Sequence, residues 1–564
     1  MNCNIQILIS LLSQHGVDRA VVCPGSRNAP IVHWLNECGA MECRSVTDER
    51  SAGFVALGMA LATGKPVAVC VTSGTALLNL APAVAEAYYR QVSLVVVSAD
   101  RPQMWIDQLD GQTLRQPGAL GCLVACSITL PESTDGENRR YCERLVNEAM
   151  LASRCPVGRP VHINVPLSEP LFDFTISDTP RVRAVAHIGN SGISFEQARL
   201  IGDRLQRAAR PMIVVGQCGF SCDISDCLRK LSECFVVLQE PLSPGRGAVG
   251  FDEVIGRVGM SVDYMPDFIL YAGGTVVSKR LKRFLRSATG AETWAVSPDG
   301  EIHDTFMNQT AVIQADFVSV MTRLTELFAE KQTGSEGILS SSCPLSATAS
   351  EFRCRWEAAL YAASRHAESF EPRYSQMMAV RMFEDMVGEL DYDFHVHYAN
   401  SSAVRLANIY ADHYIYVNRG VNGIEGSLST AAGFSMECAD MTFCVIGDLS
   451  FFYDSNALWI QNLRGNLRVL LLNNCCGGIF HQLPGLDRSP VRDSCIAAEH
   501  HASAHGICDA YDIGYFSAHN VDELARNMNT FLYSGTHRPL LFEVFTDAEE
   551  DAGAIKDYLE TFNL

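Results

Sequence analysis

Basic residues are scarce in this chain relative to acidic ones. Its 564 residues contain 44 Lys and Arg against 64 Asp and Glu, which gives a formal net charge of −20. Binding to a phosphate backbone or an anionic membrane requires a basic surface. Nucleic acid and anionic membranes are therefore excluded as main partners, and any anionic ligand needs arginines that gather locally in one cleft.

Long apolar runs and targeting features are also missing. No stretch approaches the roughly 20 apolar residues that a membrane-spanning helix needs. The opening residues MNCNIQILISLLSQHG lack the basic segment of a signal peptide, so we expect them to form a first amphipathic helix. The 21 cysteines show no framework spacing, which indicates reduced thiols and a cytoplasmic location.

What the chain does have is an alternation of strand-like and helical runs, typical of parallel α/β sheets. We predict three doubly wound α/β domains at 1–178, 192–332 and 352–564, with linkers near 177–194 and 331–350. The expected strands are 19–23, 67–71, 93–98 and 161–165 in the first domain, runs within 210–219 and 267–274 in the second, and 395–398, 414–417, 443–446, 469–472 and 540–545 in the third.

Two of these strands end in an unusual way. One is followed by Gly447-Asp448, and the next, after a helix expected at about 452–463, ends in Asn473-Asn474, so that Asn474 lies 26 positions after Asp448. Ligands of open α/β sheets gather beyond the carboxyl ends of the strands. A carboxylate, an amide oxygen and a free carbonyl in the glycine turn would converge there and hold Mg²⁺ and a diphosphate. Each motif taken alone is more often a simple turn.

The same spacing resembles the signature of thiamine diphosphate enzymes. Further motifs resemble the family of 2-succinyl-5-enolpyruvyl-6-hydroxy-3-cyclohexene-1-carboxylate (SEPHCHC) synthases of the menaquinone pathway. They are PGSRNAP (24–30), TDERSAGFVALGMA (47–60), VTSGTALLNLAPAV (71–84), SADRP (98–102), LRQPG (114–118), NSSAVRL (400–406), NRGVNGIEGSLSTAAG (418–433) and GDLSFFYDSNAL (447–458). The resemblance implies pyrimidine-binding, middle and diphosphate-binding domains, with the cofactor held between two subunits of a homodimer or homotetramer.

The resemblance also implies a cofactor site. Asp448, Asn474 and the main-chain carbonyl of Cys476 would hold Mg²⁺ or Mn²⁺, and Glu49 would activate the thiamine ring by holding a proton against its pyrimidine. The remaining cofactor-binding positions implied are Asn400, Ser401, Ile424, Leu449, Ser450, Gly477 and Ile479. Read without the family motif, Glu49 is only a charged start of an apolar helix.

Cys476 departs from the family pattern, which usually has glycine at that position. Cysteine disfavours the positive φ that glycine accepts freely. A redox or soft-metal role for Cys475-Cys476 is the alternative interpretation.

The arginines match two dianionic substrates. The resemblance implies that Arg405 and Ser401 hold the distal carboxylate of 2-oxoglutarate, and that Arg419 and Gln112 join Glu49 and Arg405 as catalytic residues. The isochorismate side is implied at Ser26, Arg27, Arg101, Gln112, Lys279, Arg280 and Arg419. The implied reaction is decarboxylation of 2-oxoglutarate followed by 1,4-addition of the succinyl carbanion equivalent to isochorismate. Any one arginine, considered alone, is more often a surface residue.

Three other interpretations stay open. The first is a different thiamine enzyme, a 2-oxo acid decarboxylase or an acetolactate synthase. The second is a Mg²⁺-dependent nucleotide hydrolase, although GMALATGKP (58–66) fails the phosphate-loop pattern. The third is an inactive scaffold. Zinc binding by the run His500, His501, His505 and Cys508 is disfavoured, because the run is typical of an ordinary helix.

Overall fold

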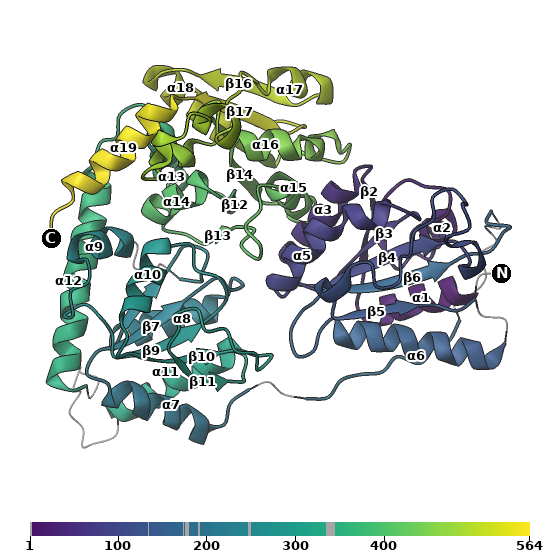
Figure 1. The fold of residues 1–564 in the computed structure, drawn as a ribbon, viewed down its shortest axis with the longest axis horizontal. Helices are drawn as coiled ribbons and strands as arrows, with labels where there is room; N and C mark the ends of the chain where they lie inside the picture. Colours follow the sequence, from purple (N-terminus) through teal and green to yellow (C-terminus); the bar gives the residue numbers. More distant parts are fainter. Residues whose placement is uncertain are drawn as a thin grey trace.

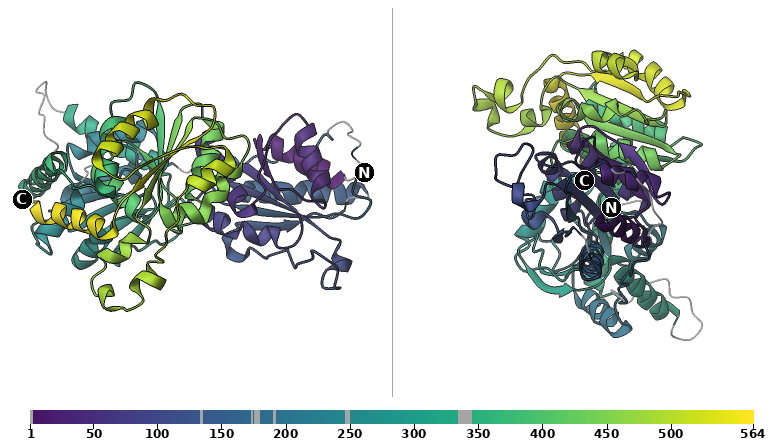
Figure 2. Two further views of the ribbon diagram at one scale, coloured as in Figure 1. Left: turned by 90° about the horizontal axis from the view of Figure 1, so that it is seen from above. Right: turned by 90° about the vertical axis from the view of Figure 1, so that its right-hand side faces the viewer.

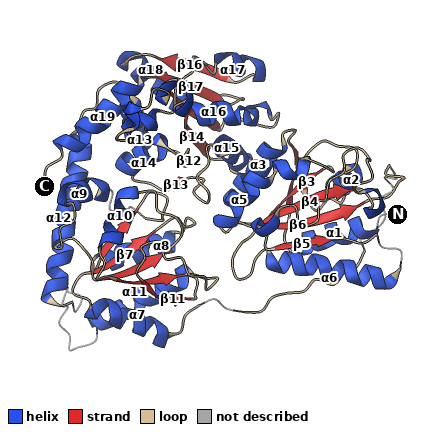
Figure 3. Cartoon of the chain, in the orientation of Figure 1, coloured by secondary structure: helices blue, strands red, loops and turns tan. Residues whose placement is uncertain are grey.

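The computed structural model contains three parallel β-sheets, one for each third of the chain (Figure 1). It describes residues 3–132, 135–172, 174, 180–189, 192–245, 250–333 and 345–564. Helices cover both faces of each sheet, which confirms the prediction of three doubly wound α/β units (Figure 3, strands in red). In the described part of the chain, no helix is both long and apolar enough to cross a bilayer.

The first sheet has the strand order β2-β1-β3-β4-β6-β5. Its core is formed by apolar strands that are buried on both faces, as expected for a covered parallel sheet. The elements are α1 (Cys3–Gln14), β1 (Arg19–Val22), α2 (Ala29–Glu37), β2 (Glu42–Ser45), α3 (Glu49–Thr63), β3 (Val67–Val71), α4 (Ala76–Asn79), α5 (Ala81–Tyr89), β4 (Leu94–Asp100), the short helices Gln103–Trp105 and Gly121–Leu123, β5 (Cys126–Thr129), α6 (Gly136–Ala152) and β6 (Val161–Pro166).

The second sheet has the order β11-β10-β9-β7-β8. Its elements are α7 (Phe195–Arg207), β7 (Pro211–Val215), α8 (Cys222–Ser232), β8 (Val236–Gln239), α9 (Phe251–Val258), β9 (Phe268–Ala272), α10 (Lys279–Ser287), β10 (Glu292–Val296), β11 (Gln309–Ile313) and α11 (Phe317–Thr333). The long helix α12 (Ala347–Ser369) packs Phe352 and Trp356 into the core of this unit. It then leads into the third unit.

The third sheet has the order β13-β12-β14-β15-β17-β16. β14 and β15 are parallel neighbours, with Gly447 beside Leu472, so their carboxyl ends lie at one edge as predicted. The elements are α13 (Gln376–Val387), β12 (Phe394–Tyr398), α14 (Ser402–Tyr410), β13 (Ile415–Tyr416), α15 (Ser427–Glu437), β14 (Met441–Gly447), α16 (Asp448–Asp454), short helices at Ser455–Trp459, Gly478–Gln482, Leu486–Arg488 and Arg492–Ile496, β15 (Leu467–Asn473), α17 (His505–Tyr511), β16 (Gly514–Ala518), α18 (Val521–Tyr533), β17 (Leu540–Phe545) and α19 (Ala548–Thr561).

Three local predictions were wrong. The helix expected at 452–463 begins at Asp448, directly after β14, because an acidic residue is favourable in the first turn of a helix. The histidine run is helical only from His505, so His500 lies outside α17. The first helix was expected to be amphipathic and so to have an exposed face. All of its residues from Asn4 to Leu12 are buried instead.

The weaker strands escaped prediction. β2 and β5 are short and partly exposed at the edges of the first sheet, and β8, β10, β11 and β16 were also missed. The predicted linkers 177–194 and 331–350 lie partly outside the described residues, and the domain limits remain predictions.

The first and third units contact each other through α3 and α15, which lie side by side in two views (Figures 1 and 2). Glycines make this close approach possible. A Cβ on Gly58 would lie 1.9 Å from the carbonyl oxygen of Thr430, and one on Gly433 would lie 2.1 Å from that of Val55. The two helix backbones therefore touch, and no side chain fits between them at these points.

Candidate functional site

The ends of β14 and β15 bring the predicted metal ligands together. Asp448 is buried at the start of α16, and its Oδ2 accepts a hydrogen bond from the backbone N–H of Cys476 at 3.1 Å. Its Oδ1 accepts from the N–H of Leu449 at 2.7 Å. The turn after β15 is therefore in direct contact with the carboxylate after β14.

The side-chain amide of Asn474 has a defined orientation. Its Nδ2 donates to Asp551 Oδ2 at 2.8 Å, which leaves its Oδ1 as the oxygen available to a cation. Asp551 in turn accepts from Gln376 N at 2.8 Å and Thr546 Oγ1 at 3.0 Å. Burial raises the pKa of Asp551 to about 6, so it is an acceptor at neutral pH. Oxygens from Asp448 and Asn474 are the ligand type that a small hard cation takes.

Cysteine at position 476 is compatible with the turn. Cys475 has a positive φ of 62°, whereas Cys476 does not have a positive φ. The strain expected at Cys476 therefore falls one residue earlier. The Cys476 carbonyl is not free as predicted, because it accepts the N–H of Gly478 at 2.9 Å, although an oxygen has a second lone pair. Gly478 is required here, since a Cβ would lie 2.3 Å from Asn474 Nδ2.

Four of the predicted cofactor-binding positions lie in or beside this turn. Ser450 is buried in the first turn of α16, and Ile479 is half-buried in the short helix 478–482. Gly477 donates its N–H to the carbonyl of Ala497 at 2.7 Å, and the Leu449 N–H is bound to Asp448. His500 Nε2 lies 3.4 Å from Asp448 Oδ2, and this carboxylate raises the pKa of His500.

Glu49 opens α3 on the first unit, directly after the helix cap Asp48. It is half-buried, and its Oε2 accepts from Asn79 Nδ2 at 3.1 Å. Its neighbours contact the third unit of the same chain. Asp48 Oδ2 accepts from Asn456 Nδ2 at 2.8 Å, and the Arg50 guanidinium lies over the ring of Tyr453 at 4.3 Å. These contacts place Glu49 beside the far end of α16, away from the turn after β15.

The loop that carries Ile424 is held by Asn400. The buried Asn400 side chain donates to the carbonyls of Asn418 (2.7 Å) and Gly423 (2.8 Å), and accepts from Arg419 Nη1 at 3.0 Å. Ile424 is 44% exposed, which is consistent with an apolar group that faces a ligand or a second subunit. Ser401 has φ of 76°, a strained conformation for a non-glycine residue that is typical of functional positions.

A pocket of about 770 Å³ between the second and third units collects three of the predicted basic residues. Lys279 and Arg280 come from the start of α10, and Arg405 comes from α14. Burial lowers the pKa of Arg405, and the nearby Asp252 carboxylate opposes that change. Ser402 also lines the pocket. Asp252, Glu253, Glu549 and Glu560 line the same pocket, so its charge is mixed, and anion binding by the three basic residues stays a prediction.

Two of the other predicted basic residues, Arg27 and Arg101, form a separate group on the first unit, whereas Arg419 lies on the third unit beside Asn400. Arg27 is buried and donates to the carbonyl of Leu167 at 3.1 Å, and burial and the charge of Arg101 lower its pKa. Arg101 Nε donates to the carbonyl of Gly111 at 3.0 Å. Ser26 and Gln112 are exposed nearby on the same loops, and Gln112 has φ of 54°. Within one chain, the described contacts do not join this group to Lys279, Arg280 and Arg405.

Two buried glutamates that were not predicted bind the backbone next to predicted site residues. Glu240 accepts from the N–H groups of Val277 and Ser278 and from Asn408 Nδ2, and burial raises its pKa to about 7. Glu86 of α5 accepts from the N–H groups of Gly420 and Val421 at 2.8 and 2.7 Å. Asp551 was missed as well, although its position shortly after the strand β17 is the signal that could have identified it.

Comparison with known proteins agrees with the geometry. Residues 5–117 match the model of the thiamine pyrophosphate enzyme N-terminal TPP-binding domain. Proteins named 2-succinyl-5-enolpyruvyl-6-hydroxy-3-cyclohexene-1-carboxylate synthase are similar over 98% of the chain. They include those of Bacteroides thetaiotaomicron (42% identical, 98% of that protein covered), Phocaeicola vulgatus (40%, 97% covered) and Porphyromonas gingivalis (34%, 96% covered). The chain therefore belongs to the SEPHCHC synthase family of thiamine diphosphate enzymes, which are transferases that form carbon–carbon bonds.

Proposed function

We propose that this enzyme decarboxylates 2-oxoglutarate and adds the resulting succinyl unit to isochorismate in a 1,4 fashion, forming SEPHCHC in cytoplasmic menaquinone biosynthesis. The observation that carries the proposal is the meeting of Asp448 and the oriented Asn474 amide beyond two neighbouring parallel strands. The names of the relatives state the product, and 2-oxoglutarate and isochorismate as its precursors are part of the proposal.

The donor set fits Mg²⁺, or Mn²⁺ in its place. Asp448 and Asn474 would supply oxygen ligands, with the second lone pair of the Cys476 carbonyl as a third. Leu449, Ser450 and Gly477 would lie along the diphosphate. Asn400, Ile424 and Ile479 would contact the rest of the cofactor, and Ser401 would lie between cofactor and keto acid.

Bound thiamine diphosphate supplies the carbon nucleophile and accepts the electrons released when the keto acid loses CO₂. Glu49 would hold a proton against the pyrimidine ring. Arg405 and Ser401 would bind the distal carboxylate of 2-oxoglutarate. Arg419, which is tied to Asn400, would orient the two substrates together with Gln112. Ser26, Arg27, Arg101, Lys279 and Arg280 would bind the carboxylates of isochorismate.

A second copy of the chain would complete the site. The two basic groups lie apart in one chain, and Val421 and Ile424 are 48% and 44% exposed on the loop beside the cofactor position. We therefore propose a homodimer or homotetramer in which the pyrimidine-binding domain (1–178) of one subunit faces the diphosphate-binding domain (352–564) of another. The middle domain (192–332) contributes Lys279 and Arg280.

The test is a turnover assay with purified protein, thiamine diphosphate, Mg²⁺, 2-oxoglutarate and isochorismate. We expect isochorismate loss and CO₂ release in equal amounts, and loss of both in Glu49→Gln. Glu37→Gln, an exposed glutamate on α2, is the matched control and should keep full activity. Release of CO₂ without loss of isochorismate would contradict the assignment of isochorismate as the acceptor. Activity retained in Glu49→Gln would contradict the proposed role of Glu49.

A further inference from the structure

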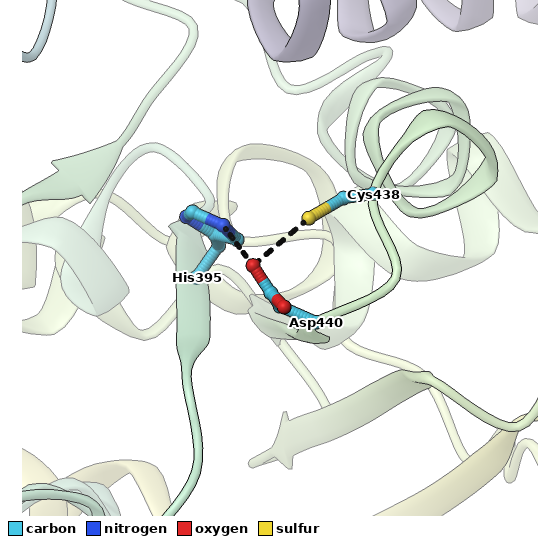
Figure 4. Close-up of side chains that lie close together, drawn as sticks. All are labelled: His395, Cys438 and Asp440. Carbon is cyan, nitrogen blue, oxygen red and sulfur yellow. Dashed lines mark hydrogen bonds and ion pairs between the residues drawn. The ribbon is translucent and has the colours of Figure 1, made fainter.

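Three metal-ligating side chains meet at the opposite end of the third sheet from Asp448. His395 is the second residue of β12, Cys438 directly follows α15, and Asp440 directly precedes β14. Because β12 and β14 are parallel neighbours, their amino ends lie together. Figure 4 shows the three side chains pointing toward one another.

The distances within this cluster suit a tetrahedral ion. His395 Nε2 lies 3.3 Å from Asp440 Oδ2, Cys438 Sγ lies 3.4 Å from the same oxygen, and all three atoms lie within 4.8 Å of one another. Ligands about 2.0–2.3 Å from a tetrahedral zinc ion are about 3.3–3.7 Å apart. A small movement of the side chains would therefore complete the coordination.

The backbone that carries the cysteine and the aspartate is held in place. Asn466 Nδ2 donates to the carbonyls of Cys438 at 3.0 Å and Asp440 at 3.2 Å. Arg464 Nη2 donates to the carbonyls of Met436 at 3.1 Å and Cys438 at 3.2 Å. This loop cannot shift easily, so the ligands are presented by a pre-formed frame.

The position of the His395 ring is defined by its aromatic neighbours. The centroid of the ring lies 4.9 Å from that of Phe434 and 5.9 Å from that of Tyr416. His397, two residues along the same strand, contacts the same two rings and is buried. The same two aromatic rings therefore contact both imidazoles of this strand.

The charges of the cluster balance those of a divalent cation. When a metal ion replaces the proton of the Cys438 thiol, the sulfur becomes a thiolate ligand. A thiolate, a carboxylate and a neutral imidazole together carry two negative charges. All three residues are half-buried, which leaves the fourth position open to water. Nitrogen, sulfur and oxygen ligands in this combination select zinc and not magnesium.

We propose that His395, Cys438 and Asp440 bind a zinc-type divalent ion, separate from the cation expected at Asp448. The ion would tie the end of α15 to the start of β12 and β14. Because α15 is the helix that packs on α3, such a tie would stabilise the contact between the first and third units.

The test uses the full-length enzyme after removal of metals by chelator dialysis, with thiamine diphosphate and excess Mg²⁺ present to fill the other cation site. Titration with Co²⁺ should give a thiolate-to-cobalt charge-transfer band with one ion bound per chain, and Zn²⁺ should displace it. Cys438→Ser should abolish the band, and His395→Ala should weaken binding by at least ~10-fold.

The controls separate this site from the other thiols. Cys476→Ser, beside the predicted Mg²⁺ ligands, and Cys495→Ser, an exposed cysteine, should keep the band. Circular dichroism would show that each variant is folded. A band that survives Cys438→Ser, a band that disappears in Cys476→Ser, or a wild-type enzyme that binds neither Co²⁺ nor Zn²⁺ would overturn the proposal.

Discussion

The first and third sheets have the same topology and different chemistry at their strand ends. The order β2-β1-β3-β4-β6-β5 is repeated as β13-β12-β14-β15-β17-β16, so each strand of one sheet has a counterpart in the other. After β3 and β4 the first unit places Thr72, Ser73 and Arg101, whereas after β14 and β15 the third places Asp448 and Asn474. The same framework thus offers donors and positive charge in one unit, and oxygen ligands in the other.

The loops before the two helices that touch also correspond. α3 follows β2 and begins at Glu49, and α15 follows β13 and is preceded by the loop of Ile424. The carboxylate expected to activate the cofactor and an apolar residue expected to contact it therefore follow equivalent strands in the two units. Function is carried by a few residues on these loops, while the shared topology places them.

The largest effect is expected from carboxylates at the strand ends. Asp448→Asn should raise the Mg²⁺ concentration needed for half-maximal activation by ~100-fold, because the one carboxylate among the three proposed protein ligands is lost. Asp100→Asn, at the end of β4 in the first sheet, should leave the Mg²⁺ requirement unchanged, because Asp100 is bound to Asn164 and to the N–H of Arg101. Equal shifts in both variants would contradict the difference between the sheets.

The next largest effect is expected from substitutions at the contact between the first and third units. Gly58→Ala and Gly433→Ala should each lower the free energy of unfolding by about 2–3 kcal/mol, because the new Cβ overlaps a backbone carbonyl. Urea unfolding would measure the change. Gly506→Ala in α17 is the matched control, since a Cβ there meets nothing within 4 Å, and it should be neutral or slightly stabilising. If Gly58→Ala is equally harmless, the two helices are not in backbone contact.

Removing the partner of Asn474 should have a smaller effect. Asp551→Ala should raise the Mg²⁺ requirement by ~10-fold, because the amide of Asn474 is then free to rotate. Asp547→Ala, which removes the N-terminal cap of the same helix, should lower stability by ~1 kcal/mol and leave the Mg²⁺ requirement unchanged. Titration of activity with Mg²⁺ distinguishes the two, and an unchanged requirement in Asp551→Ala would show that Asn474 is oriented by other contacts.

The smallest effect is expected from a buried glutamate of the middle unit, Glu253, and it is an effect on the pH dependence of stability. Burial raises the pKa of Glu253 to about 7, with Asp252 adding to the shift and Arg280 opposing it. The neutral form is therefore favoured in the folded state, and stability is lost as the pH rises from about 4.5 to about 7.

Glu253→Gln should remove this loss and be more stable than the wild type at pH 8 and not at pH 4.5. Unfolding by urea at the two pH values would measure it. Glu560→Gln, on the exposed end of α19, is the control and should show no such pH dependence. A constant difference between Glu253→Gln and the wild type at all pH values would contradict the raised pKa.

Much of this enzyme could be predicted from local sequence. The apolar strands of the sheet centres, the Gly447-Asp448 and Asn473-Asn474 ends, and the arginines in the motif loops are all contiguous patterns, and the structure places Asp448 beside the turn after Asn474 as expected. Such features depend on neighbours within a few residues, because hydrophobic periodicity and strand-end loops are encoded locally.

Other features were decided only by the tertiary structure. Asp551 orients Asn474 across 77 positions, Glu86 holds the loop of Val421 across 335, and His395 meets Asp440 across 45. The repeat of one topology in the first and third sheets is likewise seen in the order of the folded strands. Contacts of this kind arise when parallel strands distant in the chain align their ends, and that alignment is a property of the packed sheet and not of any single segment.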